Sequence, residues 1–223
     1  WLNEGFATYL TALWYEHRDG PAAYQRNIRG NFDGLAGADK PDAPGAVGMV
    51  SNIYTHPWEV FRRPANPYGK GSSVLHMLRR RLGDDLFFRG VAQFIDTHKF
   101  QTVETNDLRR AFEDVSGQSL EQFFAQWCMR PGVPSLTVMP EWDAAAGSLR
   151  VTVTQTQNIN GDNPAYEFVL PVTVRVPGEK ALRTVRVPVT GRDAAAAFPL
   201  PAEPDMVVID PELDVLAGMT IEQ

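Results

Sequence analysis

The stretch that decides the fold is the first eleven residues, Trp1-Leu2-Asn3-Glu4-Gly5-Phe6-Ala7-Thr8-Tyr9-Leu10-Thr11. Its large apolar residues recur at helical spacing and continue to Trp14, which predicts one helix over residues 1–18. The inward face of this helix carries a single acidic residue, Glu4, and a carboxylate is costly to bury unless a cation meets it. On the residues alone, Glu4 is better explained by the helix dipole, which favours acids in a first turn. Metal binding would need about three ligands at matched spacing.

The composition excludes several classes of protein. The 223 residues carry a formal net charge of −6 and no basic field, which argues against nucleic acid as a partner. Cys128 is the only cysteine, so neither an intrachain disulfide nor a cysteine-based zinc site can form. No apolar run approaches the roughly 20 residues that a membrane-spanning helix needs. The sequence therefore predicts a globular chain without a membrane span, and it leaves the cellular compartment unknown.

Helical spacing dominates the chain as far as residue 132. A second helix is predicted over Ala22 to about Leu35, where Pro21 can open the first turn, and a third is opened by residues 66–71 and runs through Arg81. Further helices are predicted over residues 86–95, over residues 105–115 and after Ser119, which has the spacing of a capping box. Five prolines interrupt residues 38–67, so no regular element is expected there. A connection of this length is either the wall or lid of an active site or a plain surface loop, and both interpretations stay open.

Period-2 alternation begins after the segment Arg130–Pro134. It is found over residues 149–153, 168–176 and 182–187, and two shorter strands are predicted at residues 194–199 and 206–209. Turn signals such as Asn160-Gly161 and Pro177-Gly178 separate these strands, which favours an antiparallel β-sandwich. We therefore predict an α + β chain, with a helical domain over residues 1–132 and a β-sandwich domain over residues 133–223.

Several helical motifs occur in a fixed order. Residues 1–10 are followed by residues 66–78, which read Asn-Pro-Tyr-Gly-Lys-Gly-Ser-Ser-Val-Leu-His-Met-Leu. The segments Leu82–Phe88, Phe112–Gly117, Phe123–Trp127 and Arg130–Pro134 come next. This ordered set, which covers most of the first 135 residues, resembles the aminopeptidase N (membrane alanyl aminopeptidase) family of zinc metallopeptidases. Residues 1–10 look like the third-ligand helix of that family, and residues 66–78 resemble its Tyr-x-Lys-Gly helix.

The resemblance implies the all-α C-terminal half of a thermolysin-like catalytic domain, followed by the family's β-sandwich. It implies a Zn²⁺ cofactor with Glu4 as its third protein ligand, and Tyr68 as the catalytic residue that donates a hydrogen bond to the oxyanion. The family's other two ligands are the histidines of an HExxH helix, which also carries the general base. That helix is absent from the chain. The chain's own histidines lie too far apart in the sequence to replace it: His17, His56, His76 and His98.

Other residues in these motifs have less definite roles. Asn3 and Thr8 are candidates for orienting Glu4 or a histidine ligand, and an ordinary place on a helix explains them equally well. Lys70 is expected to be solvated, with an ion pair to an acidic neighbour as the alternative, and His76 is expected to be packed or at the surface. Gly69 departs from the family pattern, in which a larger residue often stands between the tyrosine and the lysine.

We therefore expect a fragment of a zinc aminopeptidase that removes N-terminal residues from peptides with a free N-terminus. The fragment alone is expected to be inactive, because it lacks HExxH. Two alternatives are a bifunctional epoxide hydrolase and aminopeptidase of the same family, and a non-enzymatic scaffold or binding member that has lost its metal site. The presence of both Glu4 and Tyr68 argues against the scaffold.

Overall fold

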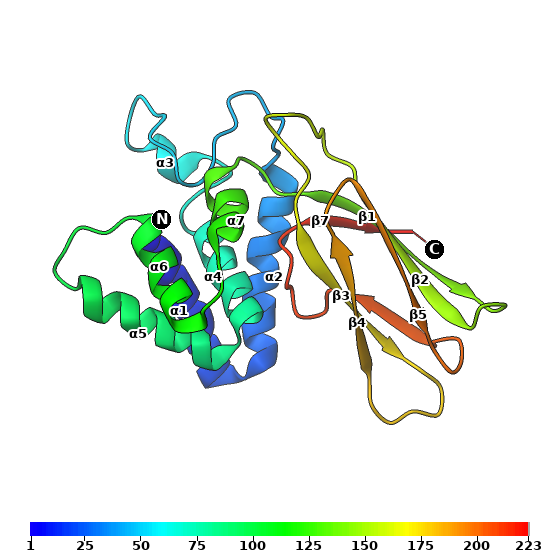
Figure 1. The fold of residues 1–223 in the computed structure, drawn as a ribbon. Helices are drawn as coiled ribbons and strands as arrows, with labels where there is room; N and C mark the ends of the chain where they lie inside the picture. Colours follow the sequence, from blue (N-terminus) through cyan, green and yellow to red (C-terminus); the bar gives the residue numbers. More distant parts are fainter. Residues whose placement is uncertain (223) are drawn as a thin grey trace. The chain divides into compact units, whose positions relative to one another are not determined.

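The computed structural model describes residues 1–222. It divides into two compact units, Trp1–Gly132 and Val133–Gln223. The first unit is helical and the second is built from strands (Figure 1). The predicted α + β class, with helices first and two sheets after them, is confirmed. None of the helices in residues 1–222 combines the length and the apolar character that a membrane crossing requires.

The helical unit has one central helix. Its elements are α1 (Leu2–Asp19), α2 (Pro21–Ala38), α3 (Glu59–Arg62), α4 (Gly69–Leu82), α5 (Asp84–His98), α6 (Thr105–Ser116), α7 (Glu121–Phe124) and the π-helical turn η1 (Ala125–Met129). Every residue of α4 from Lys70 to Leu78 is buried, and α1, α2 and α5 pack against it. A helix that is covered on all sides is the core of its unit.

The helix boundaries follow from individual residues. Pro21 is the first residue of α2, where its missing N–H is not needed. Gly83 has φ +80° and separates α4 from α5, and Gly117 ends α6 in the left-handed conformation with φ 66°. The predicted cap at Ser119 was wrong, because the N-cap of α7 is Leu120. The Leu120 N–H instead donates to the Glu113 carboxylate over 2.7 Å.

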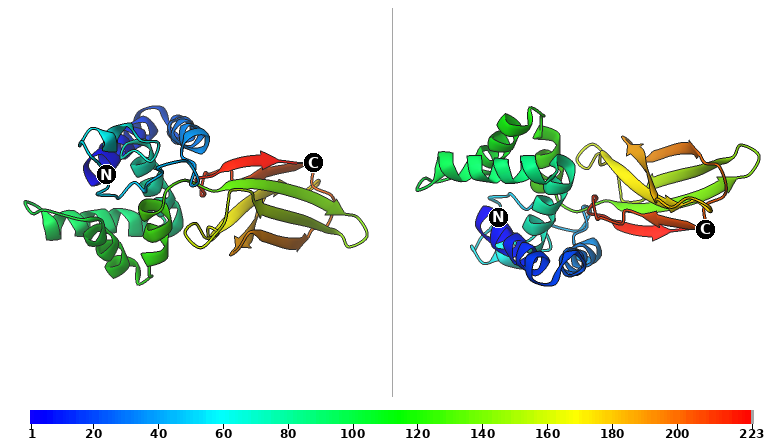
Figure 2. Two further views of the ribbon diagram at one scale, coloured as in Figure 1. Left: turned by 90° about the horizontal axis from the view of Figure 1, so that it is seen from above. Right: turned by 90° about the horizontal axis from the view of Figure 1, so that it is seen from below.

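The second unit consists of two sheets (Figure 2). Its strands are β1 (Ser135–Asp143), β2 (Ser148–Gln155), β3 (Phe168–Arg175), β4 (Arg183–Val189), β5 (Asp193–Pro199), β6 (Met206–Ile209) and β7 (Gly218–Ile221). The strand orders are β5-β2-β1-β7 and β4-β3-β6. Neighbouring strands are antiparallel except β1 and β7, which pair in parallel with Ser135 opposite Gly218. Buried residues of both sheets form the core of the sandwich, and in β3 burial is continuous from Leu170 to Val174. The core includes Val138, Val151, Val153, Leu170, Val172 and Val187.

Candidate active site

Glu4 lies in the first turn of α1, and its side chain is partly exposed. The Asn3 side chain donates from Nδ2 to Glu4 Oε1 over 3.4 Å. Thr8 lies one helical turn further along, and its hydroxyl makes no hydrogen bond within the described residues 1–222. Of the two residues predicted to orient Glu4, the structure therefore places Asn3 in contact with its carboxylate and leaves Thr8 without a polar link to it.

Tyr68 is the N-cap residue of α4. Its backbone is held on both sides, because the Asn66 Oδ1 accepts from the N–H groups of Tyr68 and Gly69 at 3.1 and 3.0 Å. The Tyr68 carbonyl accepts from the Ser72 N–H over 2.9 Å. The phenol ring is 40% exposed and packs on Phe61, with ring centroids 6.0 Å apart. A fixed backbone thus presents a phenol at the surface of the unit, and within residues 1–222 its hydroxyl has no hydrogen-bond partner.

Two glycines bring the segments of Glu4 and Tyr68 together. A Cβ on Gly71 would lie 2.7 Å from the Gly5 Cα, which is closer than real Cβ atoms approach. Helices α1 and α4 therefore cross at backbone contact. Glu4 directly precedes one glycine, and Tyr68 stands three residues before the other. The two candidate side chains, which are far apart in the sequence, consequently flank the same helix crossing.

A cavity of about 750 Å³ opens beside the start of α1. Its wall comes from Trp1–Asn3, from residues 49–52 of the proline-rich segment, and from residues 103–106 at the start of α6. The Trp1 indole N–H donates to the Thr105 hydroxyl over 3.0 Å, which joins two of these walls. The cavity lining includes Asn3 but neither Glu4 nor Tyr68. The proline-rich segment thus forms part of a cavity wall next to the residue that contacts Glu4.

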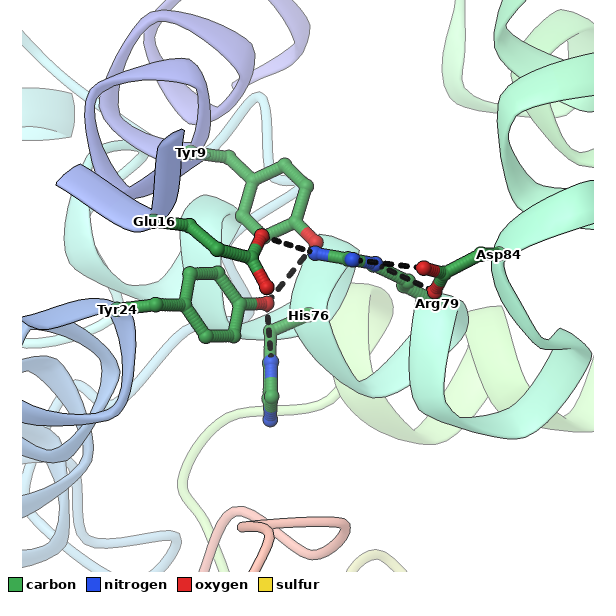
Figure 3. Close-up of polar contacts among 6 residues, drawn as sticks. All are labelled: Tyr9, Glu16, Tyr24, His76, Arg79 and Asp84. Atoms are coloured by element: carbon green, nitrogen blue, oxygen red, sulfur yellow. Dashed lines mark hydrogen bonds and ion pairs between the residues drawn. The ribbon is translucent and has the colours of Figure 1, made fainter. Parts of the chain in front are cut away.

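His76 belongs to a polar cluster inside the helical unit and lies away from solvent (Figure 3). The Tyr24 hydroxyl forms hydrogen bonds with the Tyr9 hydroxyl at 3.0 Å and with the His76 Nδ1 at 2.6 Å. Burial raises the pKa of both tyrosines above the ordinary value of 10.0. The cluster therefore links α1, α2 and α4 through hydroxyl and imidazole groups, and His76 serves packing here, as the packed alternative in the sequence predicted.

Arg79 extends this cluster toward α5. Its guanidinium pairs with Glu16 of α1 at 2.9 Å and with the Asp84 carboxylate at 2.8 and 2.9 Å (Figure 3). It also lies over the Tyr24 ring, 5.4 Å from the centroid. The Asp84 carboxylate raises the pKa of Arg79, and the guanidinium in turn holds the pKa of Asp84 below its ordinary value. No motif signalled this cluster, because its members come from four separate helical segments.

The residues of this chain do not by themselves fit a zinc ion. Protein zinc sites use three or four nitrogen, sulfur or oxygen ligands. Within residues 1–222, no three His, Cys, Asp or Glu side chains are grouped closely enough to hold a metal ion. His76 is engaged with Tyr24, and Cys128 is buried. Glu4 is therefore a single carboxylate, and any metal bound to it would need further ligands from outside this chain.

Comparison with known proteins gives one family. A model described as the peptidase family M1 domain matches residues 1–127. The tricorn protease-interacting factor F2 of Thermoplasma acidophilum is 28% identical over 192 residues, which cover 82% of this chain and 23% of that protein. Aminopeptidase N of Lactococcus lactis is 32% identical over 139 residues, which cover 60% of this chain and 16% of that protein.

The fold is also shared with a solved structure. The crystal structure of Legionella pneumophila aminopeptidase A in complex with aspartic acid matches with a TM-score of 0.77 at 18% identity. The match covers 100% of this chain and 24% of that one. The chain thus spans less than a quarter of the length of the proteins it resembles. Because the family model matches more than half of the sequence, the chain belongs to peptidase family M1.

Proposed function

We propose that these 223 residues are part of a zinc-dependent aminopeptidase that removes N-terminal residues from peptides. The observation that supports the proposal is the backbone contact between α1 and α4 at Gly5 and Gly71, because Glu4 directly precedes Gly5 and Tyr68 is the N-cap of α4. Membership of peptidase family M1 and relatives that are named aminopeptidases support peptide hydrolysis as the reaction.

Each candidate residue has one task in this proposal. Bound zinc supplies a Lewis acid and a water activated near neutral pH. Glu4 would be one of the protein ligands, with Asn3 Nδ2 donating to its carboxylate and limiting its rotation. The remaining ligands and the general base would come from residues outside this chain, since no ligand set is grouped within residues 1–222.

Tyr68 would act on the substrate directly. Its hydroxyl has no hydrogen-bond partner among residues 1–222, so it is available to donate to the oxyanion that forms when water attacks the scissile carbonyl. Its backbone is anchored by Asn66 and Ser72, so the donor is held in place before substrate binds. A preorganised donor of this kind contributes about 2.7–4 kcal/mol to transition-state stabilisation.

The test of this role is Tyr68→Phe in the natural protein that contains the chain. Loss of the hydroxyl should lower kcat for an amino-acid anilide by about 10²–10³-fold, with little change in KM, because the hydrogen bond is made mainly in the transition state. Tyr15→Phe removes a hydroxyl from the partly exposed Tyr15 of α1 and should leave kcat unchanged. An unchanged kcat in Tyr68→Phe would remove Tyr68 from the mechanism.

The isolated 223-residue chain provides a second test. It should hydrolyse no amino-acid anilide and retain no zinc after dialysis, because Glu4 is the only candidate ligand that it contributes. Zinc content by atomic emission and anilide turnover measure the two properties separately. Robust hydrolysis by the purified chain would show that the chemistry lies within these residues and that the assignment of roles is wrong.

A further inference from the structure

Lys70 lies two residues after Tyr68 and is completely buried. Its Nζ forms an ion pair with Asp39 Oδ2 at 2.6 Å and donates to the Gly132 carbonyl at 2.9 Å. The Gly132 N–H in turn donates to Asp39 Oδ1 over 3.0 Å. The prediction of a solvated lysine was therefore wrong. We refer to Lys70, Asp39 and Gly132 together as the lysine clamp.

The lysine clamp joins the two ends of one segment. Asp39 is the C-cap of α2 and Lys70 is in the first turn of α4. Their ion pair therefore holds together the two ends of the segment of residues 40–69. Gly132 packs against the start of this segment so closely that a Cβ on Gly132 would lie 2.3 Å from the Pro41 nitrogen. A buried ion pair is often no more stabilising than an apolar pair of the same size. The Lys70–Asp39 pair instead fixes the two ends of the segment relative to each other.

The segment of residues 40–69 carries much of the candidate site. Tyr68 stands at its end, and residues 49–52 form part of the cavity wall. In its middle, the Val50 N–H donates to the Cys128 carbonyl over 2.9 Å. Residues 52–59 are exposed throughout, so little packing holds this part of the segment, whereas Ala65 and Pro67, close to Tyr68, are buried. The position of Tyr68 therefore depends on the lysine clamp together with the Asn66 side chain, which accepts from the Tyr68 N–H, and not on the exposed residues 52–59.

We propose that Lys70 is a positioning residue for Tyr68. By its ion pair with Asp39, Lys70 holds the two ends of the segment together, and this keeps the Tyr68 hydroxyl where the oxyanion of the substrate develops. This inference rests on the function proposed above for Tyr68. The Lys70 ammonium is engaged with Asp39 and Gly132, so it acts through the backbone of the first turn of α4 and does not touch substrate. A displacement of about 1 Å in a catalytic group costs about 10²-fold in rate.

The experiment uses the natural protein that contains the chain, with the double replacement Asp39→Asn and Lys70→Met. Removing both charges leaves no unpaired charge in the interior, so the fold should survive. We expect kcat for an amino-acid anilide to fall by about 10²-fold while KM stays nearly constant. Amide hydrogen exchange of Asn66, Tyr68 and Gly69 should become faster. Lys40→Met is the matched control, because Lys40 is an exposed lysine next to Asp39.

A double-mutant cycle separates positioning from general loss of structure. If the clamp acts through Tyr68, the double replacement should cost little further rate in a Tyr68→Phe background. An equal loss in both backgrounds, or unchanged hydrogen exchange at Asn66, Tyr68 and Gly69, would overturn the proposal. If the double replacement does not fold, Asp39→Glu keeps the charge while lengthening the side chain. An equal rate loss with and without Tyr68→Phe, or unchanged hydrogen exchange near Tyr68, would overturn the proposal for this variant too.

The outcomes also separate this inference from the proposed function. A Tyr68→Phe variant with full activity refutes the catalytic role of Tyr68, and the positioning role falls with it. A Tyr68→Phe variant with the expected loss, together with a fully active clamp variant, refutes the positioning role alone.

Discussion

Replacing Gly71 by alanine tests the closest approach of two helices in the helical unit. The new Cβ would stand 2.7 Å from the Gly5 Cα, whereas ordinary van der Waals contact is 3.4–4 Å. Helices α1 and α4 must therefore separate by about 1 Å, because a backbone atom cannot turn aside as a side chain can. Overpacking of this kind costs about 1–3 kcal/mol, and alanine returns about 1 kcal/mol through its higher helix propensity. We expect a net loss of about 0–2 kcal/mol in the free energy of unfolding.

Gly30→Ala is the matched control for this measurement. Gly30 lies on α2 and is exposed, and a methyl group added there would meet no atom within 4 Å. The same substitution should therefore stabilise the unit there by about 0.5–1 kcal/mol. Urea unfolding followed by the helical circular dichroism signal compares the two variants under identical conditions. A Gly71→Ala variant as stable as Gly30→Ala would refute the reasoning, because it would show that α1 and α4 do not meet at these glycines.

Two further predictions concern buried polar groups. Tyr24→Phe removes the hydroxyl that joins Tyr9 to His76 and should lower the free energy of unfolding by about 1–3 kcal/mol. The same change at Tyr15 should cost under about 0.5 kcal/mol, and equal losses in thermal unfolding would contradict this. Burial raises the pKa of the Cys128 thiol from 9.0 to about 12, so the folded state holds this proton more tightly than the unfolded state. This contribution to the free energy of unfolding is complete below about pH 9 and declines from there toward about pH 12. The Cys128→Ala variant has no such thiol, so its free energy of unfolding, measured with urea over the same pH range, should fall less than that of the unchanged chain.

Elements with strong local signals were predictable from the sequence. The predicted helix that became α4 carries Val74, Leu75, Leu78 and Leu82 at helical spacing, and all four are buried. Pro21 begins α2 and Gly117 ends α6, because a missing N–H and a left-handed φ are properties of single residues. Local chemistry of this kind can be read without knowledge of the partners.

Elements that depend on distant partners were missed. Strand β1 carries Pro140 near its centre, which obscures its alternation, and its parallel neighbour β7 has only four residues. Their pairing joins Ser135 to Gly218, and no local pattern announces a contact over that separation. The cap at Ser119 failed for the same reason, because the Glu113 carboxylate takes the place of a local side-chain cap.

The candidate site was predictable only in part. Motifs pointed to Glu4 and Tyr68, and two glycines within the same motifs, Gly5 and Gly71, form the contact between α1 and α4. Lys70 was expected in solvent because lysine is rarely buried without a partner. An ion pair with an acidic neighbour was the alternative, but its partner Asp39 lies at the edge of a proline-rich stretch with no pattern of its own, so the sequence did not identify it.

The parallel pairing of β1 and β7 has a mechanical consequence. These are the first and last strands of the second unit, and they run in the same direction with four residues of each in register. Tension applied at the two ends of this unit would pull β1 toward its start and β7 toward its end. All hydrogen bonds between the two strands would then be loaded in shear at once, so the unit should resist stretching far better than one whose terminal strands can be peeled apart one bond at a time.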